Sequence, residues 1–299
     1  MRSGVRMLRP VILALGLLAV AGCAAKPAHP GVIARAPYGQ GRASIPDDHV
    51  PAFAQVPYEP FARQEAVAIA LREWRLFGQP VDDRAPQDVP PPLPDQKPER
   101  WPGLWERVGE YWWTAMWPGM KEARWTGKHN AEGEVFPASE DGNYAWSAAF
   151  ISYVMRIAGA GARFPYSINH AGYINAALQG GYALRDRRPA DYAPKPGDLI
   201  CWGMRHNVPL TFNDLPTDRP FPGHCDIVVA ARPGQLSVVG GNVDDAVTMK
   251  HIPTTAEGRL ADASGTVLDT RYAWFVVVQV LYDVNALPDS DAPPAAPAS

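Results

Sequence analysis

Three polar side chains, Ser147, His224 and Asn242, have the types and settings that nucleophilic hydrolysis needs. Ser147 lies in the first turn of the apolar segment 146–159, which has helical spacing. Unpaired backbone N–H groups and the helix dipole favour developing negative charge at such a position. His224 opens the apolar run 224–230, and Asn242 follows two glycines at the end of the next apolar run. Because an imidazole can accept a hydroxyl proton and an amide can orient the imidazole, these residues predict a Ser–His–Asn site.

Helices in the first half of the domain and strands in the second half are expected to position these side chains. Apolar residues recur at helical spacing in four segments, and short runs rich in Val, Ile and aromatic residues follow Pro196-Gly197. This order predicts an α+β domain. The expected helices are 61–77, 104–116, 146–159 and 168–178, and the expected strands are 198–202, 224–230, 236–240 and 272–280.

Each of the three candidate residues also has a purely structural interpretation. Serine at a helix start is most often a cap. His224 could bond backbone at a strand end, and an asparagine after two glycines is more often a turn residue than a catalytic one. Only the combination of the three residues favours a catalytic site.

Several short motifs occur in an order that resembles a known superfamily. Pro196-Gly197-Asp198, Gly223-His224 and Gly240-Gly241-Asn242 follow the helix that begins near Ser147. The order is similar to that of the NlpC-type papain-like superfamily, including the CHAP amidases, which cleave peptide or amide bonds in peptidoglycan. The chain resembles the uncharacterised family called domain of unknown function 2272 more closely, over roughly residues 61–283. The resemblance implies a papain-like fold, with N-terminal helices packed on an antiparallel sheet.

Carried over residue by residue, the resemblance makes Ser147 the nucleophile, His224 the base and Asn242 the residue that orients the base. The superfamily normally has cysteine at the position of Ser147, and a thiol ionises far more readily than an alcohol. Three interpretations therefore stay open. The first is a Ser–His–Asn hydrolase of peptidoglycan, placed slightly ahead; the others are an inactive peptidoglycan binder with the same fold and a structural lipoprotein.

The expected ligand is peptidoglycan or its stem peptides, contacted by Trp146, His170 and Tyr173. His170 precedes or begins the second helix of the expected core, where it could line a groove opposite Ser147 or serve in capping and packing. Six of the ten tryptophans lie in 101–125. Their faces could stack on sugar rings, although packing into the core is the favoured interpretation.

The cysteines Cys201 and Cys225 are expected to serve structure rather than catalysis. Strand alternation turns Cys225 to the face opposite His224, which argues against Cys225 as the nucleophile. In the superfamily the strands that carry these two cysteines are neighbours, so a disulfide between them is one expectation and two buried free thiols are the other. Their spacing with His206 and His224 matches no common zinc site, so no metal and no cofactor is expected.

The first 22 residues are expected to be a secretory signal. Three arginines precede an uncharged run that is too short to span a bilayer, and Val20-Ala21-Gly22-Cys23 resembles a bacterial lipobox. Acyl chains on Cys23 would anchor the protein in a membrane, expected to be the outer membrane facing the periplasm. An ordinary signal with a chance cysteine is the alternative.

The rest of the chain is expected to hold one domain. Residues 23–60 are rich in Pro, Ala and Gly and predict a flexible tether. The domain is expected at 61–283, as a helical extension (61–125) and a papain-like core (126–283), followed by a disordered tail at 284–299. With 28 Lys and Arg residues against 31 Asp and Glu residues, the chain has no basic excess for binding nucleic acid. No protein partner can be inferred from the sequence.

Overall fold

The computed structural model describes residues 60–88, 90, 92–117, 119–129, 134–137 and 144–287. These residues all belong to one compact unit of the chain. The expected signal peptide, the lipidation residue Cys23, nearly all of the tether and the tail from residue 288 lie outside the described residues. Among the described residues, no helix has the length and apolar character needed to span a membrane.

Within the described ranges, four α-helices form on the amphipathic segments that the sequence predicts. They are α1 (Arg63–Leu76), α2 (Leu104–Ala115), α3 (Ser147–Ile157) and α4 (His170–Gln179). Helix α1 buries Val67, Leu71 and Trp74 on one side and ends before Gly78, whose φ of 86° suits a helix end. Short 3-10 turns occupy Pro86–Asp88, Pro94–Gln96, Pro98–Arg100, Lys121–Arg124, Gly161–Arg163 and Phe212–Asp214.

In the part of the chain that the structure describes, seven strands follow the helices and pair antiparallel throughout. They are β1 (Leu184–Arg187), β2 (Leu199–Arg205), β3 (Val208–Pro209), β4 (Gly223–Arg232), β5 (Gln235–Val243), β6 (Ala246–Pro253) and β7 (Trp274–Val280). The spatial order is β1-β7-β2-β4-β5-β6, with β3 paired to β2. The predicted α+β class is therefore confirmed. Strands β1, β3 and β6 are additions to the four strands expected.

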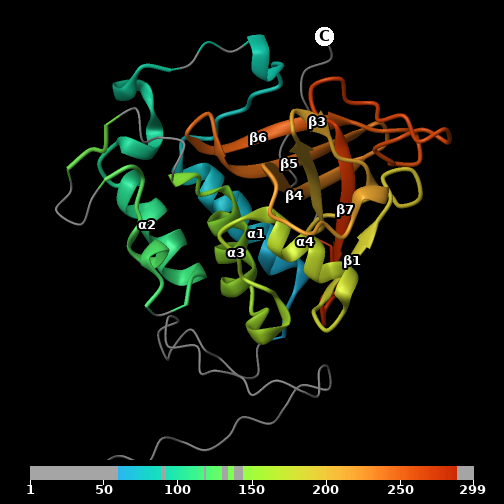
Figure 1. Ribbon diagram of the computed structural model, residues 1–299, viewed down its shortest axis with the longest axis horizontal. Helices are drawn as coiled ribbons and strands as arrows, with labels where there is room; N and C mark the ends of the chain where they lie inside the picture. Colours follow the sequence, from blue (N-terminus) through green and yellow to red (C-terminus); the bar gives the residue numbers. More distant parts are fainter. Residues whose placement is uncertain are drawn as a thin grey trace, which may run out of the picture. The chain divides into compact units, whose positions relative to one another are not determined.

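The two faces of the sheet are buried by different partners. All four helices contribute to the larger core, which includes Phe150 of α3, Cys225 and Ile227 of β4. In Figure 1 the helices gather on one side of the sheet. The opposite face carries a second core that includes Ile200 and Val228 and contains no residue from the helices. This division decides which side chains of β4 face α3.

Two further segments pack on the domain, one after α1 and one at its C-terminal end. Residues 80–84 lie along β6, where Val81 bridges Met249, so this segment after α1 forms a strap on the sheet. At the other end, Val284 bridges Ala62, and Asn285 accepts a hydrogen bond from Arg63 at 3.2 Å. Residues 284 and 285, which follow the expected end of the domain, therefore contact α1 and the residue before it.

Candidate functional site

The hydroxyl of Ser147 lies at the N-terminus of α3 and meets an imidazole, but the imidazole belongs to His170. The distance from Ser147 Oγ to His170 Nε2 is 2.7 Å. Trp146 occupies the N-cap position and makes no side-chain capping bond, so Ser147 is not the helix cap. The first backbone N–H groups of α3 have no acceptor within the helix and lie beside this hydroxyl.

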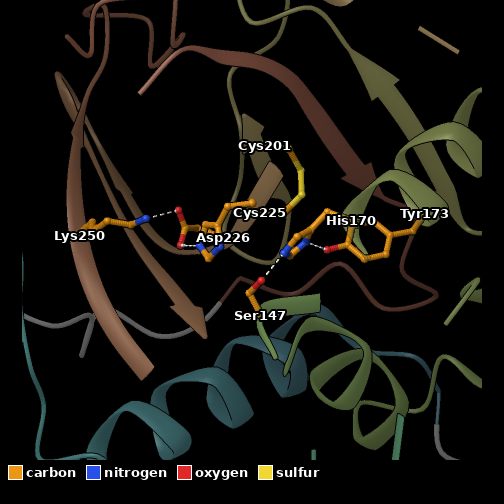
Figure 2. The surroundings of a disulfide bond; sticks show 8 residues. Ser147, His170, Tyr173, Cys201, Cys225, Asp226 and Lys250 are labelled. Carbon is orange, nitrogen blue, oxygen red and sulfur yellow. Dashed lines mark hydrogen bonds and ion pairs between the residues drawn. A yellow bond between two sulfur atoms is a disulfide. The ribbon is translucent and has the colours of Figure 1, made fainter. Parts of the chain in front are cut away.

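Helix α4 holds His170 in place from its own first turn. Asn169 caps α4 by accepting a hydrogen bond from the backbone of Gly172, so His170 is the first helical residue. Its Nδ1 contacts the hydroxyl of Tyr173, one turn along the helix. Figure 2 shows Ser147, His170 and Tyr173 in one line of contacts. Burial, together with the nearby His224, lowers the pKa of His170 well below its ordinary value, although Asp226 opposes this shift.

A neutral His170 can serve as a base in one of its two tautomers. With the proton on Nδ1, the ring donates to the Tyr173 oxygen and leaves the Nε2 lone pair for the Ser147 hydroxyl. Burial also raises the pKa of Tyr173 well above its ordinary value, so the phenol stays protonated and neutral. The three side chains therefore form a neutral hydrogen-bonded chain at neutral pH.

The second histidine, His224, belongs to a different group of side chains. Its Nε2 lies 2.9 Å from Asp226 Oδ1, and Asp226 Oδ2 lies 2.8 Å from Lys250 Nζ. In the register between β2 and β4, His224 is opposite Trp202 and Asp226 is opposite Ile200. Directly opposite residues share a face of the sheet. The His224 group therefore lies on the face of the sheet that carries the second core.

Charge balance explains why Asp226 can be ionised inside the sheet. Burial alone would raise the pKa of this carboxyl, but the charges of Lys250 and His224 outweigh burial and hold the pKa well below its ordinary value. Asp226 is fully buried, and Lys250 is 1% exposed. Figure 2 shows the Lys250 ammonium group pointing at the Asp226 carboxylate.

The two imidazoles nevertheless come close together. The ring centroids of His170 and His224 are 5.4 Å apart, and the ring planes make an angle of 62°. His170 uses Nε2 for Ser147 and Nδ1 for Tyr173, so the rings meet through van der Waals contact and electrostatics. His170 therefore lies between Ser147 and the charged group on the other face of the sheet.

The glycines before Asn242 allow close packing around this site. A Cβ at Gly240 would lie 2.0 Å from Asp226 Oδ1 and 2.7 Å from His224 Nε2. On the other face, a Cβ at Gly241 would lie 2.5 Å from Cβ of Phe150, so α3 packs directly on β5. Any larger residue at either position would push these groups apart.

The expected Ser147–His224–Asn242 arrangement is not the one that forms. The imidazole that Ser147 contacts is His170, whereas strand alternation places His224 on the face of the sheet opposite Cys225. The group that orients His224 is Asp226. Asn242 has a left-handed φ of 58°, and its Oδ1 is buried without a hydrogen-bond partner among the described residues.

The expected substrate contacts are also buried. Trp146 is fully buried between Phe77 and Tyr111, and its Nε1 donates to Glu99 Oε2 at 2.5 Å. Tyr173 is fully buried, and His170 is 4% exposed. In this conformation Trp146 and Tyr173 offer no surface to a ligand, and His170 contacts the candidate nucleophile.

The two cysteines of the sheet are joined by a disulfide. Cys201 and Cys225 are directly opposite each other on β2 and β4, and both are fully buried in the helix-side core. Their side chains therefore lie on the face opposite His224, as alternation requires. Within the part of the chain that the structure describes, no cluster of His, Cys, Asp and Glu has the makings of a metal site.

Sequence reasoning missed Asp226 and Lys250. Asp226 lies two residues after His224, so the period of two along a strand puts both on one face. Lys250 interrupts the apolar run of β6, and a charge inside a buried strand requires a partner. These signals could have identified the His224–Asp226–Lys250 group, although not the contact of His170 with Ser147.

Comparison with protein families gives one match. The family model described as an uncharacterized protein conserved in bacteria, DUF2272, matches residues 99–280, more than half of the chain. The chain belongs to the DUF2272 family. The DUF2272 match includes every residue of the site described above, whereas α1 precedes it and still packs into the same core. Comparisons with curated proteins and with solved structures found no match.

Proposed function

We propose that this DUF2272 protein is a cell-envelope hydrolase that cleaves peptide or amide bonds of peptidoglycan stem peptides. The observation that carries the proposal is the 2.7 Å contact between Ser147 Oγ and His170 Nε2 at the N-terminus of α3. The proposal keeps Ser147 as the nucleophile and replaces the expected base, His224, with His170. The packing of α3 against β4 and β5 supports the further proposal of a papain-like fold.

The proposed reaction is acyl transfer through a covalent ester. His170 Nε2 accepts the Ser147 proton as Oγ attacks the carbonyl carbon of the substrate. Backbone N–H groups of the first turn of α3 stabilise the oxyanion. The amine leaves with the proton from His170, and water then hydrolyses the ester by the same base. The nearby His224 lowers the pKa of His170, and the nearby Asp226 raises it.

The experiment compares two serines of the same helix. Purified protein is incubated with peptidoglycan and with stem-peptide fragments, and new products are identified by mass spectrometry. Ser147→Ala should reduce product formation at least ~100-fold, since it removes the nucleophile. Ser152→Ala is the matched control, because Ser152 lies on α3 and its hydroxyl bonds the backbone of Ser167, away from His170.

A further pair of variants tests which histidine is the base. His170→Gln should abolish activity, and His224→Gln should leave measurable turnover. Loss of activity in both variants, with both still folded, would favour a shared role. No product from the parent protein would mean that the hydrolase proposal is wrong.

The burial of the site favours a second candidate function. Ser147 is 9% exposed and His170 is 4% exposed, which suits a structural link between α3 and α4. In this second interpretation, the protein is a non-catalytic lipoprotein of the cell envelope that binds peptidoglycan or has a structural role. Two results together would support the peptidoglycan-binding form. Insoluble peptidoglycan would retain the parent protein and Ser147→Ala equally, and no new products would appear.

We also propose that Cys23 carries a lipid and tethers the domain to the periplasmic side of the outer membrane. The Cys201–Cys225 disulfide supports this location, because such bonds persist mainly in oxidising compartments. The Val20-Ala21-Gly22-Cys23 motif supports the lipid itself.

A further inference from the structure

A buried acid, Glu99, lies beside the chain that enters α3. Glu99 belongs to the 3-10 turn Pro98–Arg100 and is fully buried. Its Oε2 accepts a hydrogen bond of 2.5 Å from the indole Nε1 of Trp146, the residue immediately before Ser147. The nucleophile of the proposed reaction is therefore one residue away from a side chain that an acid distant in the sequence holds.

The other oxygen of Glu99 faces a buried lysine that holds the same stretch of chain. Lys128 Nζ lies 3.7 Å from Glu99 Oε1 and donates to the carbonyl oxygen of Tyr144 at 3.1 Å. Lys128 is 1% exposed, and a charge this deep normally requires an opposite charge beside it. Together, Glu99 and Lys128 hold Tyr144 and Trp146, which lie three residues and one residue before Ser147.

Trp146 links this acid to the start of α3. It is the N-cap residue of the helix, and its carbonyl oxygen accepts a hydrogen bond of 2.9 Å from the backbone of Phe150. Its ring is fully buried and tightly packed, since a Cβ at Gly241 would lie 2.8 Å from Trp146 Cζ3. A ring enclosed in this way cannot turn by itself. A shift of the indole therefore moves the first turn of α3, and the Ser147 hydroxyl moves with it.

We propose that Glu99 is a positioning residue for the hydrolysis, whose carboxylate keeps Ser147 in place against His170. The ionised acid holds the start of α3 through Trp146 and Lys128, and protonation weakens both contacts. A hydrogen bond to a carboxylate is roughly twice as strong as one between neutral groups, and a neutral acid no longer attracts the ammonium group. The inference rests on the proposed function, because the role that it gives Glu99 belongs to that reaction.

Glu99 changes its charge in the neutral pH range. Burial raises the pKa of Glu99 to about 7, and the nearby Asp245 adds to the rise, although the charge of Lys128 and the Trp146 N–H oppose it. About half of the molecules therefore carry a protonated Glu99 at pH 7. The pKa of His170 is well below its ordinary value of 6.5, so the proposed base is neutral throughout this range. A change of rate near pH 7 would then report Glu99 and not the base.

The other ionisable groups around Glu99 contact partners of their own. Asp245, in the turn between β5 and β6, pairs with Lys97 at 3.1 Å. In the same turn, burial and the carboxyl of Asp82 raise the pKa of Asp244 to about 7. Asp244 therefore titrates in the same range as Glu99 and is the matched control. The remaining contacts are those of His129 with Gly127, Glu106 with Gly103, Arg107 with Glu73, and Glu110 with Arg107.

The first test is the pH dependence of kcat for the full chain with stem-peptide fragments, from pH 5.5 to 9. In the parent, kcat should rise with a midpoint near pH 7 as Glu99 ionises. Glu99→Gln keeps the size and one acceptor oxygen, and it reproduces the neutral state that the folded parent already populates. Its kcat should be at least ~10-fold lower at pH 8.5, without the midpoint, because a misplaced nucleophile reacts slowly. Asp244→Asn should keep the midpoint. An unchanged midpoint in Glu99→Gln would overturn the proposal.

A second test needs no turnover and separates this inference from the proposed function. NMR spectra of the full chain follow the indole N–H of Trp146, identified by its absence in Trp146→Phe, and the backbone amide of Ser147. Both signals should shift with a midpoint near pH 7 in the parent and stay constant in Glu99→Gln. If the parent forms no product but both signals titrate, the hydrolase proposal is wrong and the control of Ser147 by Glu99 is supported. A folded parent in which neither signal titrates would overturn the inference.

Discussion

At the scale of single residues, Lys250 is the clearest case of a charge kept inside the fold by one partner. Its ammonium group lies 2.8 Å from the Asp226 carboxylate and 4.6 Å from the ring centroid of Tyr272. Both members of the pair are almost fully buried. Replacement of Lys250 leaves the buried Asp226 carboxylate with His224 but without its ammonium partner, which costs more than the intact pair contributes.

We therefore predict that Lys250→Met lowers the free energy of unfolding by about 3–5 kcal/mol, the cost of an unpaired buried charge. Adding Asp226→Asn to Lys250→Met should recover more than half of the loss, because the uncompensated carboxylate is then gone. Guanidinium denaturation at pH 7 measures both values. Lys195→Met, at an exposed lysine, is the control. A loss below about 1 kcal/mol for Lys250→Met would contradict the prediction.

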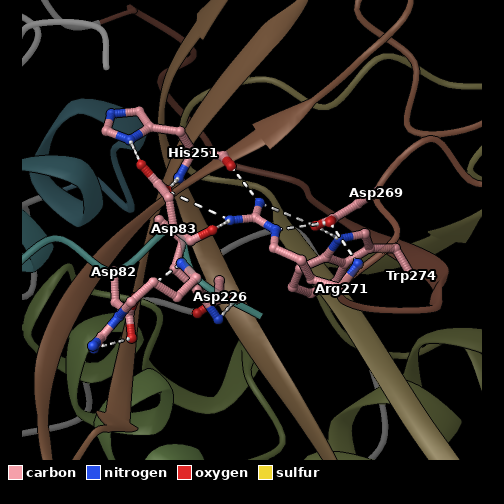
Figure 3. Close-up of polar contacts among 9 residues, drawn as sticks. Asp82, Asp83, Asp226, His251, Asp269, Arg271 and Trp274 are labelled. Atoms are coloured by element: carbon pink, nitrogen blue, oxygen red, sulfur yellow. Dashed lines mark hydrogen bonds and ion pairs between the residues drawn. The ribbon is translucent and has the colours of Figure 1, made fainter. Parts of the chain in front are cut away.

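At the scale of elements, residues 80–84 form a strap along the edge strand β6. Backbone bonds of 3.0 Å join Asp82 and Pro80 to Met249. Arg271 then bonds the carbonyl oxygen of Asp83 at 2.7 Å, and Asp83 accepts from the backbone of His251, also at 2.7 Å. Figure 3 shows Arg271 between Asp83, His251 and Asp269. The strap covers an edge that would otherwise present unpaired backbone groups.

We predict that Arg271→Ala releases this strap. Hydrogen exchange at the amides of Asp82 and Met249 should become faster, and the free energy of unfolding should fall by about 2 kcal/mol, since the buried Asp269 also loses a charged donor. Arg84→Ala is the matched control, because the side chain of Arg84 is 60% exposed and its ion pair with Asp82 is superficial. Unchanged exchange in Arg271→Ala would show that the backbone bonds alone hold the strap.

At the scale of the whole molecule, buried ionisable groups give folding two opposite dependences on pH. Burial raises the pKa of Asp186 from 3.8 to about 8, so the folded state holds this proton more tightly than the unfolded state. Stability from this group falls as pH rises, until pH passes about 8. His170 has the opposite sign, because its lowered pKa makes stability fall as pH drops below 6.5.

Between pH 6.5 and 8, Asp186 loses its proton near its pKa of about 8, and Glu99 and Asp244 lose theirs near pKa values of about 7. The contribution of Asp186 alone is a fall of about 1–2 kcal/mol in the free energy of unfolding across this window, since one proton corresponds to about 1.4 kcal/mol per pH unit. Asp186→Asn should remove this contribution and leave the part that comes from Glu99 and Asp244. Asp191→Asn, which changes an exposed carboxylate close in sequence, should keep the full decrease. Chemical denaturation at several pH values measures the three curves, and an equal decrease in Asp186→Asn would contradict the assignment.

The local pattern of apolar residues was sufficient to predict most of the helices and strands. The helices α1 to α4 and the strands β2, β4, β5 and β7 follow apolar spacings of 3.6 and 2 residues, which short segments carry by themselves. Strand β6 was missed because Lys250 and His251 interrupt its apolar run. The ion pair that makes a lysine acceptable there depends on Asp226, which is distant in the sequence.

The sequence by itself determined the α+β class, the place of Ser147 at the start of α3 and the opposite faces of His224 and Cys225, because each follows from neighbouring residues. Only the tertiary structure decided which imidazole meets the Ser147 hydroxyl. That contact depends on how α4 packs beside α3, and the 2.7 Å distance to His170 joins residues that no periodicity relates. The pairing of Asp226 with Lys250 is tertiary for the same reason, since two strands of the sheet must come together before the charges meet.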